Sequence, residues 1–241
     1  MNQPTLAAVR GTAVLTGGDV PIESASRLAS TVQALPVGFG AAGTSSVGVG
    51  VSFALNLVTD ETTSVIEENA SLTGARDLTM TANARVDAVT EARMGASISD
   101  GTASVAPAIA ITTSVVTTSV IIAPIGGDNL LEISGDLSAV AQQRTSAVTT
   151  SGAQAAGGSS AAVGVSLAPT ISAHSVFART DRDITAGGGI AFGALGSSHN
   201  ESHASASASG ASPKTENDAD TSSTGGGSVA DKLQSQRNFA D

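Results

Sequence analysis

Apolar and small side chains alternate strictly along residues 47–57. Val, Phe and Leu occupy every odd position from Val47 to Leu57, and Gly, Ser, Ala and Asn occupy every even position between them. Because successive side chains of a β-strand point to opposite faces, this period of two predicts a long strand with one apolar face. We expect the apolar face to pack against the rest of the protein and the face of small residues to be the open one.

The alternation recurs twice further along the chain. Val105 begins a similar run 58 residues after Val47, and Val163 begins another after a further 58, with Pro107 and Pro169 inside the two copies. A second marker, an aspartate followed by a short apolar run, has nearly the same spacing. It stands at Asp19, Asp77 and Asp136, and a fourth copy without the aspartate begins at Gly189.

Self-similarity at a fixed period is the sequence mark of stacked repeats. We therefore predict an all-β fold, a right-handed parallel β-helix (a solenoid) of about four imperfect 58-residue repeats. The right-handed sense follows from the usual hand of parallel connections. Each repeat divides most simply into two turns of about 29 residues, with three shorter turns as the alternative.

The repeats also predict the boundaries of the chain's parts. The first residues lack the long strand that opens a repeat, so we expect the chain to be a piece of a longer array. The last residues have no apolar period and are rich in Ser, Thr, Gly, Asn and Asp, which predicts a flexible loop or linker with a short helix at 229–239 as an option. The predicted parts are residues 1–44 (a partial first repeat), 45–102 (second repeat), 103–159 (third repeat), 160–211 (fourth repeat) and the linker 212–241.

Within the clearest repeat, clusters of polar residues predict turns at 59–61, 67–69 and 74–77. The Ala-rich segments 86–99 and 138–154 have helical propensity, but their apolar positions do not fit a period of 3.6 residues. Alternation therefore favours a strand there.

Composition restricts the core and the partners. The chain has 5 Phe and no Trp or Tyr, so Val, Ile, Leu and Ala must supply the buried area. A net charge of −10 disfavours nucleic acids and anionic membrane surfaces as partners. The apolar tracts are too short for membrane insertion. With no cysteine, disulfides and thiolate metal sites are excluded.

The segment Val49–Asn56 reads Val-Gly-Val-Ser-Phe-Ala-Leu-Asn, followed by a Thr-rich stretch at 59–63 and by Ala-Ser-Leu-Thr-Gly-Ala-Arg-Asp-Leu-Thr-Met-Thr-Ala at 70–82. These residues resemble the repeats of very large bacterial filamentous adhesins, the leukotoxin-like and filamentous-haemagglutinin-like surface proteins. The likeness spans about residues 1–211, with Pro107 and Pro169 as departures. It implies secretion across the bacterial envelope, a β-helical shaft and attachment to cells or surfaces, and it implies no catalytic residues.

His199, Glu201 and His203 are the one candidate for a metal site. On a strand these alternate positions share a face, so two imidazoles and a carboxylate could meet a divalent cation. No further ligand is evident and the spacing is not the helical His-Glu-x-x-His, so a polar rim of the last turn is the simpler interpretation. We therefore predict no metal, no cofactor and no catalytic residue.

Acidic residues in pairs are interpreted as solvated turn charges, because no calcium-binding Gly-Gly-x-Gly-x-Asp repeat accompanies them. The glycine pairs and triplets are interpreted as sites of close backbone packing, since no phosphate-binding context follows them. The acidic groups are Asp60–Glu61, Glu67–Glu68, Asp181 with Asp183, and Glu216, Asp218 and Asp220; the glycines are Gly48, Gly50 and Gly187–Gly189.

The stacked repeats predict a structural stalk or filament segment, and the resemblance implies that it belongs to a secreted bacterial surface adhesin, located outside the cell or on its surface. We expect no enzymatic activity. The expected partners are neighbouring repeats of the same long chain, further copies joined end to end, and a host-cell, glycan or surface receptor. The alternative is a β-helical carbohydrate-binding or polysaccharide-degrading module, although such sites usually need aromatic platforms and clustered carboxylates. Ice binding is disfavoured, because paired threonines recur only once per repeat.

Overall fold

The computed structural model describes residues 1–36, 47–98, 102–127, 130–157 and 161–209. The predictions for residues 212–241 therefore concern residues outside this set. The described residues form strands and short connections with no helix, and every strand pairing among them is parallel. The all-β fold with the stacked parallel sheets of a β-solenoid is thus as predicted.

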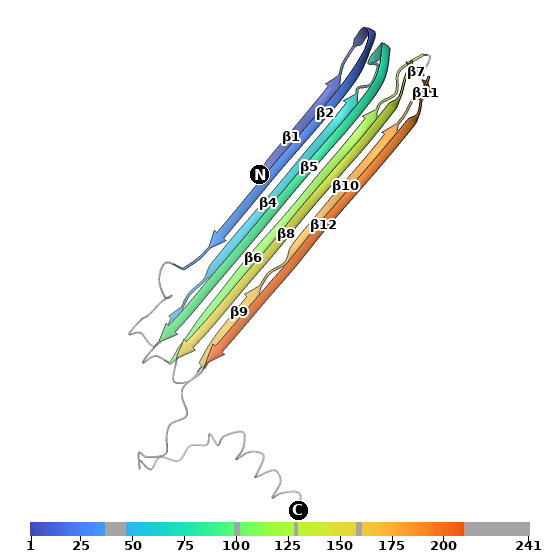
Figure 1. Ribbon diagram of the computed structural model, residues 1–241. Helices are drawn as coiled ribbons and strands as arrows, with labels where there is room; N and C mark the ends of the chain where they lie inside the picture. Colours follow the sequence, from blue (N-terminus) through green and yellow to red (C-terminus); the bar gives the residue numbers. More distant parts are fainter. Residues whose placement is uncertain (37–46, 99–101, 128–129, 158–160, 210–241) are drawn as a thin grey trace, which may run out of the picture. The chain divides into compact units, whose positions relative to one another are not determined.

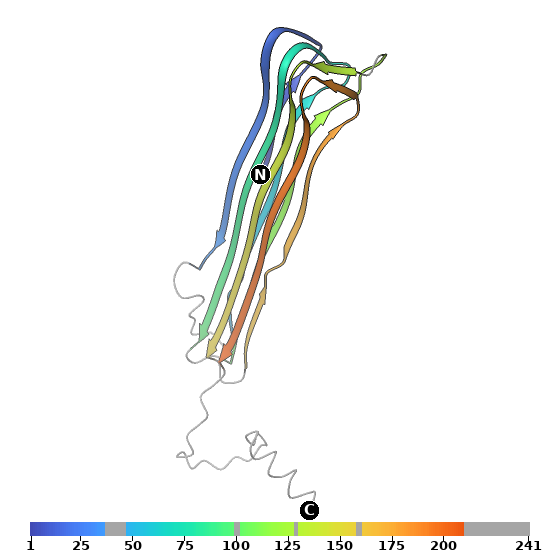
Figure 2. The same cartoon turned by 45° about the vertical axis from the view of Figure 1, so that its right-hand side comes forward.

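Two long sheets form two layers (Figures 1 and 2), and a short third sheet lies between consecutive long strands. Sheet A contains β1 (Asn2–Val9), β3 (Val47–Val49), β4 (Ser52–Ile66), β6 (Ala103–Ile122), β9 (Ala161–Leu167) and β10 (Thr170–Thr180). Sheet B contains β2 (Thr12–Ala34), β5 (Ser71–Ile98), β8 (Leu137–Gly157) and β12 (Ile190–Ser209). The third sheet pairs β7 (Leu130–Ile133) with β11 (Asp183–Ala186).

The chain runs along sheet A, turns, and returns along sheet B, so one coil consists of one passage through each long sheet (Figure 1). Ser52 lies opposite Ala108 in sheet A, and Val20 lies opposite Leu78 in sheet B, separations of 56 and 58 residues. The prediction of two turns of about 29 residues is therefore wrong, because hydrogen-bonded partners are a whole coil apart. Strands of 15 to 28 residues, such as β4 and β5, use up the length that shorter turns would need.

Two of the three predicted turns are absent for the same reason. Residues 59–61 lie inside β4 and residues 74–77 lie inside β5. At the second place the strand is bent rather than ended, since Gly74 has a φ of 77°. The turn at 67–69 is confirmed: Asn69, with a φ of 60°, lies at the corner between β4 and β5. The Ala-rich segment 86–98 is part of β5, as alternation indicated.

The prolines coincide with breaks in sheet A. Pro107 lies within β6 and has no N–H to donate. The neighbouring chain is interrupted opposite it, between Val49 at the end of β3 and Ser52 at the start of β4. Pro169 separates β9 from β10, and its carbonyl accepts a hydrogen bond from the Thr112 N–H at 3.1 Å.

The alternation of residues 47–57 is confirmed, but its polarity is the reverse of the prediction. Ser52 and Ala54 point into the interior, whereas Phe53 and Leu57 are 55% and 53% exposed. The opposite sheet explains this: a Cβ atom on inward-facing Gly50 would lie 2.0 Å from Met94 Cε. The two layers approach so closely here that only small side chains fit between them.

The interior changes in character along the strands. At the end where sheet A passes into sheet B it is filled by large aliphatic side chains, and at the other end it consists largely of alanine. Hydroxyl side chains bond to one another between the layers, as Thr112 Oγ1 does with Thr90 and Thr149 at 2.6 Å each. Among the residues described, no helix has the length and apolarity needed to cross a bilayer.

Candidate functional site

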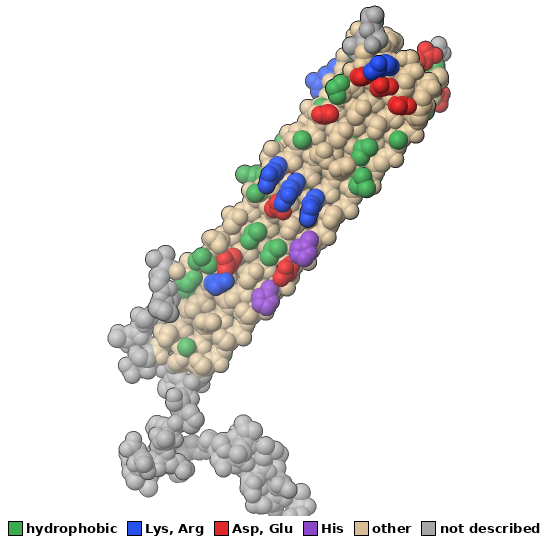
Figure 3. Space-filling view, in the orientation of Figure 1, with side chains coloured by type: hydrophobic (Ala, Val, Ile, Leu, Met, Phe, Trp, Pro, Cys, Tyr) green, Lys and Arg blue, Asp and Glu red, His purple; other side chains and the backbone are tan. Residues whose placement is uncertain are grey.

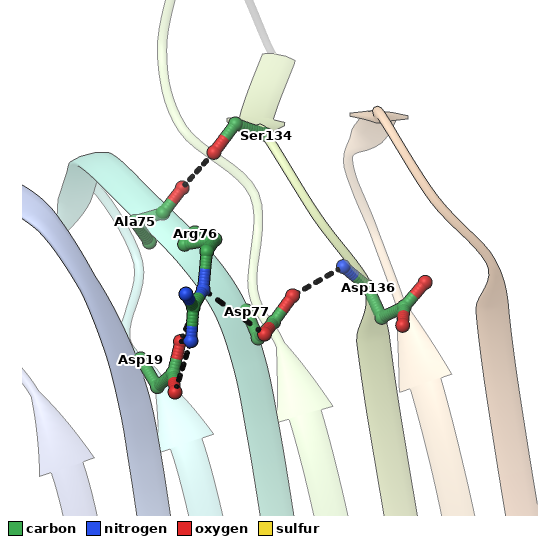
Figure 4. Close-up of polar contacts among 6 residues, drawn as sticks. All are labelled: Asp19, Ala75, Arg76, Asp77, Ser134 and Asp136. Carbon is green, nitrogen blue, oxygen red and sulfur yellow. Dashed lines mark hydrogen bonds and ion pairs between the residues drawn. The ribbon is translucent and has the colours of Figure 1, made fainter.

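The recurring aspartates form a ladder of hydrogen bonds at the entry to sheet B (Figure 4). Asp77 Oδ1 accepts a hydrogen bond from the Asp136 N–H at 2.8 Å, and Asp136 Oδ1 accepts one from the Gly189 N–H at 2.6 Å. Each carboxylate thus binds the backbone of the next coil. At the first step the Asp19 carboxylate instead receives Nε and Nη2 of Arg76, at 2.8 and 2.7 Å.

Electrostatics favour the charged forms of Asp77 and Arg76. The hydrogen bond from the Asp136 N–H, together with the attraction of Arg76, lowers the pKa of Asp77. The hydrogen bond to Asp19 raises the pKa of Arg76. A carboxyl group held as its anion is a good acceptor and a poor general acid. We therefore interpret the repeated aspartates as structural links between coils.

The glycines beside this ladder confirm the interpretation of close backbone packing. A Cβ atom on Gly187 would lie 2.1 Å from the Ser134 carbonyl oxygen, and one on Gly188 would lie 2.1 Å from Asp136 Oδ1. Any larger residue would push the last coil away from its neighbour.

A row of three arginines crosses the outer face of sheet B (Figure 3). Arg27 lies opposite Arg85, and Arg85 lies opposite Arg144. All three side chains are exposed, and within the described residues only Arg85 has an ion-pair partner, Asp87 at 3.1 Å. Neighbouring strands are about 4.8 Å apart, so the like charges repel one another. Such a row can bind carboxylate, sulfate or phosphate groups.

The metal-site candidates lie on the same face, on β12. His199, Glu201 and His203 are alternate, exposed residues of this strand, as the sequence indicated. His199 Nε2 is 3.6 Å from Glu201 Oε2, and these two side chains are 67% and 59% exposed. In the described part of the chain, no group of three or more His, Cys, Asp or Glu side chains is placed to hold a metal ion. The arrangement is thus an exposed imidazole beside a carboxylate, with a second imidazole further along the strand.

A groove of about 890 Å³ next to His203 is lined mainly by residues of β5, β8 and β12. Gly152 forms part of its floor, and Arg93, Thr150 and Ser205 line it. Arg93 is already paired with Glu91, which limits its charge for a ligand. Hydroxyl groups and a single imidazole suit hydrogen bonding to an uncharged polar molecule.

One acidic pair departs from its prediction. Residues 67–68 and Asp181 lie at corners between strands, as expected. Asp60, however, is 1% exposed inside β4, where its Oδ1 accepts a hydrogen bond from Ser26 Oγ at 2.6 Å and its Oδ2 accepts one from Thr62 Oγ1 at 3.1 Å. The interpretation of Asp60 as a solvated turn charge is wrong, because the alternation continues through it. Glu61 and Asp183 are exposed on strands, and Glu216, Asp218 and Asp220 lie outside the described residues.

Arg182 is a structural cation that sequence reasoning missed. Its side chain donates hydrogen bonds to the carbonyl oxygens of Ala123, Ala70 (2.8 Å) and Glu67 (3.2 Å), so it joins the corners of three consecutive coils. Only 5% of the residue is exposed, and this burial lowers the pKa of its guanidinium. No repeated arginine in the sequence signals such a role.

The outer face of sheet A is apolar and exposed. We use the name apolar face for its outward residues from Val47 to Leu57 and the residues opposite them, within 103–113 and 161–171. Sequence reasoning found these side chains but placed them inside. The large exposed side chains of the apolar face are Val47, Val49, Val51, Phe53, Leu55, Leu57, Val163, Val165, Leu167 and Ile171.

Comparison with known proteins found no match: no family model, no curated protein and no solved structure is similar to this chain.

Proposed function

We propose that the chain is a structural stalk or filament segment of a secreted bacterial surface adhesin, which extends or displays a binding region for attachment to cells or surfaces. The observation that supports this most is the in-register parallel pairing of long strands from coil to coil. The strands of each coil in such a stack pair only with those of the adjacent coils, so length is set by the number of coils. A spacer needs this property, and a catalyst does not.

The finer architecture belongs to the same proposal. The coils wind in a right-handed sense and derive from about four imperfect 58-residue repeats, of which residues 45–102 are the clearest. No catalytic group, metal or cofactor takes part in this function. The segment works outside the cell or on its surface.

Exposed apolar side chains on the last coil support the proposal that a partner packs against this end of the stack. Ile190 is 49% exposed, whereas Leu137, its counterpart one coil earlier, is 1% exposed. Phe192 is 37% exposed on the same strand. Covering these side chains would extend the apolar interior by one more layer. The neighbouring repeats of a longer chain, or a further copy joined end to end, would supply that layer.

The stalk proposal is tested by lengthening the chain. Four extra copies of residues 45–102, inserted in tandem after residue 102, should lengthen the particle by about 19 Å at the usual strand spacing. Small-angle scattering and electron microscopy measure that increase. A particle that grows in all directions, or forms separate domains joined by linkers, would contradict the proposal.

The arginine row favours a second candidate, a module that binds an acidic polysaccharide. Arg27, Arg85 and Arg144 lie one strand spacing apart and present their guanidinium groups to solvent. A polymer with regularly spaced carboxylate or sulfate groups could pair with them along the row. A glycan array should then show binding to acidic glycans that the double variant R27Q/R144Q loses. Binding that persists in this variant would exclude the row as the site.

A further inference from the structure

The apolar face is unusual for the outside of a soluble sheet. Val51, Phe53 and Ile171 are 66%, 55% and 58% exposed. Antiparallel and parallel sheets alike normally bury their apolar side. Here the apolar side chains are too large for the interior, so they remain outside with no covering layer among the described residues.

The size of the apolar face matches that of a protein interface. Three strands at a spacing of about 4.8 Å and the 11 positions from Val47 to Leu57 at about 3.3 Å each give a flat footprint of roughly 520 Å². Side chains that project from the sheet increase the accessible area above this footprint. It therefore approaches the roughly 800 Å² that each partner contributes to an interface of standard size, and it reaches the upper range of the largest apolar patch on a typical monomer.

Charge narrows the choice of partner. The outward positions of the apolar face carry no charged residue, and the first outward charges along the strands are Glu61 and Arg179, beyond its border. A partner surface must therefore be apolar, flat and uncharged as well. The chain itself offers one such surface, the same face on a second copy, and packed sheet faces lie about 10 Å apart.

We propose that two copies of the chain pack against each other through their apolar faces, related by a two-fold axis. An interface of this kind uses the same patch on both partners, so one flat apolar sheet satisfies both sides. The arginine rows then remain on the outside of the pair, where their charges stay in water. The chain's own last segment is a poor alternative occupant, because residues 210–241 offer only Val229, Leu233 and Phe239 as large apolar residues.

The test compares two double variants with equal numbers of exposed aliphatic residues. Leu55 and Leu57 on the apolar face are 43% and 53% exposed, and Val89 and Leu195 on the outer face of sheet B are 40% and 58% exposed. Threonine keeps the strand propensity of each position. In sedimentation velocity at micromolar concentrations, the unaltered chain and V89T/L195T should form dimers. L55T/L57T should dimerise at least about tenfold more weakly, with an unchanged circular dichroism spectrum.

Protection of an introduced thiol distinguishes a second copy from the other possible occupants of the apolar face. The experiment is clean because the chain has no cysteine of its own. The thiol introduced by L55C should react with a maleimide at low protein concentration and become protected as the concentration rises, while the thiol of V89C stays reactive throughout. Protection that does not depend on concentration would show that the chain covers its own face. Protection that appears only with phosphatidylcholine vesicles would show a lipid surface. Either result would overturn the proposal, as would a monomer at all concentrations or a dimer that survives in L55T/L57T.

Discussion

The space between the two long sheets is filled by different kinds of side chain at its two ends. Where sheet A passes into sheet B, Leu78 and Leu137 are 0% and 1% exposed and pack with other large aliphatic residues. At the opposite end the same two layers are filled by Ala54, Ala92 and Ala110, and the large side chains of those strands lie outside. We call these regions the aliphatic end and the alanine end.

The difference teaches that side-chain size, rather than hydrophobicity alone, decides which face of a strand is inward. Alanine and glycine let the layers approach until Met94 meets Gly50, and no Val or Leu fits in that gap. The apolar area buried per residue is then small. Hydrogen bonds between hydroxyl groups of the two layers, such as that between Thr112 and Thr90, therefore contribute to holding the layers together. Stability should therefore be concentrated at the aliphatic end.

The largest expected effect is the loss of a leucine at the aliphatic end. The substitution L78A removes a fully buried side chain and leaves a cavity between the sheets, so it should lower the free energy of unfolding by about 2–5 kcal/mol. Urea denaturation followed by circular dichroism measures this. L195A, at a 58% exposed site on the outer face of sheet B, should change the value by no more than about 0.5 kcal/mol. Equal losses in both variants would contradict the assignment of the interior.

Arg182 gives the next largest effect, because it closes the aliphatic end. R182M keeps much of the side-chain volume but leaves the carbonyl groups of Ala70, Glu67 and Ala123 without their charged donor. We expect a loss of about 3 kcal/mol in the same denaturation experiment. The control R10M removes an exposed pair with Glu67, whose value is at most about 1 kcal/mol. A loss in R182M as small as that in R10M would show that solvent replaces the arginine.

The alanine end should respond to an added side chain rather than to a removed one. Ala110 is 0% exposed between the closely spaced layers, so A110L should force the sheets apart and cost about 1–3 kcal/mol. A173L adds the same atoms to an exposed outward position of sheet A and should stay within about 0.5 kcal/mol of the unaltered chain. A stabilising A110L would reveal unfilled space at this end.

Alternation predicted long strands, and the recurrence of the pattern after about 58 residues predicted their parallel stacking. The alternation could not tell which side of the 47–57 segment is inward, because a period of two shows that the faces differ without showing the distance to the opposite sheet. The number of strands in each coil could not be predicted from the sequence either. Thr59, Asp60 and Glu61 have turn chemistry, yet they continue a strand whose inward positions run on through Asp60 and Thr62 to Ile66.

The candidate site could be predicted only in part. The shared face of His199 and Glu201 follows from their spacing on a strand. The regular spacing of Asp19, Asp77 and Asp136 marked the repeat, but the hydrogen bonds between coils became visible only in the structure. The arginine row needed the register between strands. Its members are 58 and 59 residues apart, and they become neighbours only when the coils stack in that register.

The smallest expected effect lies between the two ends, at His174. Its ring nitrogens bond to three hydroxyl groups, with Thr145 and Ser198 at 3.0 Å from Nδ1 and Ser114 at 3.3 Å from Nε2. Burial lowers the pKa of His174 below its ordinary value of 6.5. In the unfolded chain the ordinary pKa returns, so at lower pH the unfolded chain binds a proton that the folded protein resists. The contribution of His174 to stability is therefore complete above pH 6.5 and is lost as the pH falls through the folded-state pKa.

The measurement compares urea midpoints at about pH 7.5 and pH 5.5, on either side of the ordinary histidine pKa. The unaltered chain should lose more stability between these pH values than H174N, since an amide keeps hydrogen-bonding capacity without titrating. H199Q is the matched control, because it removes an imidazole that is 67% exposed instead of one packed between the sheets. The same pH dependence in H174N and in the unaltered chain would mean that other groups cause it. A reduced dependence in H174N alone would place a titrating group between the aliphatic and alanine ends, where the interior changes from carbon to hydroxyl contacts.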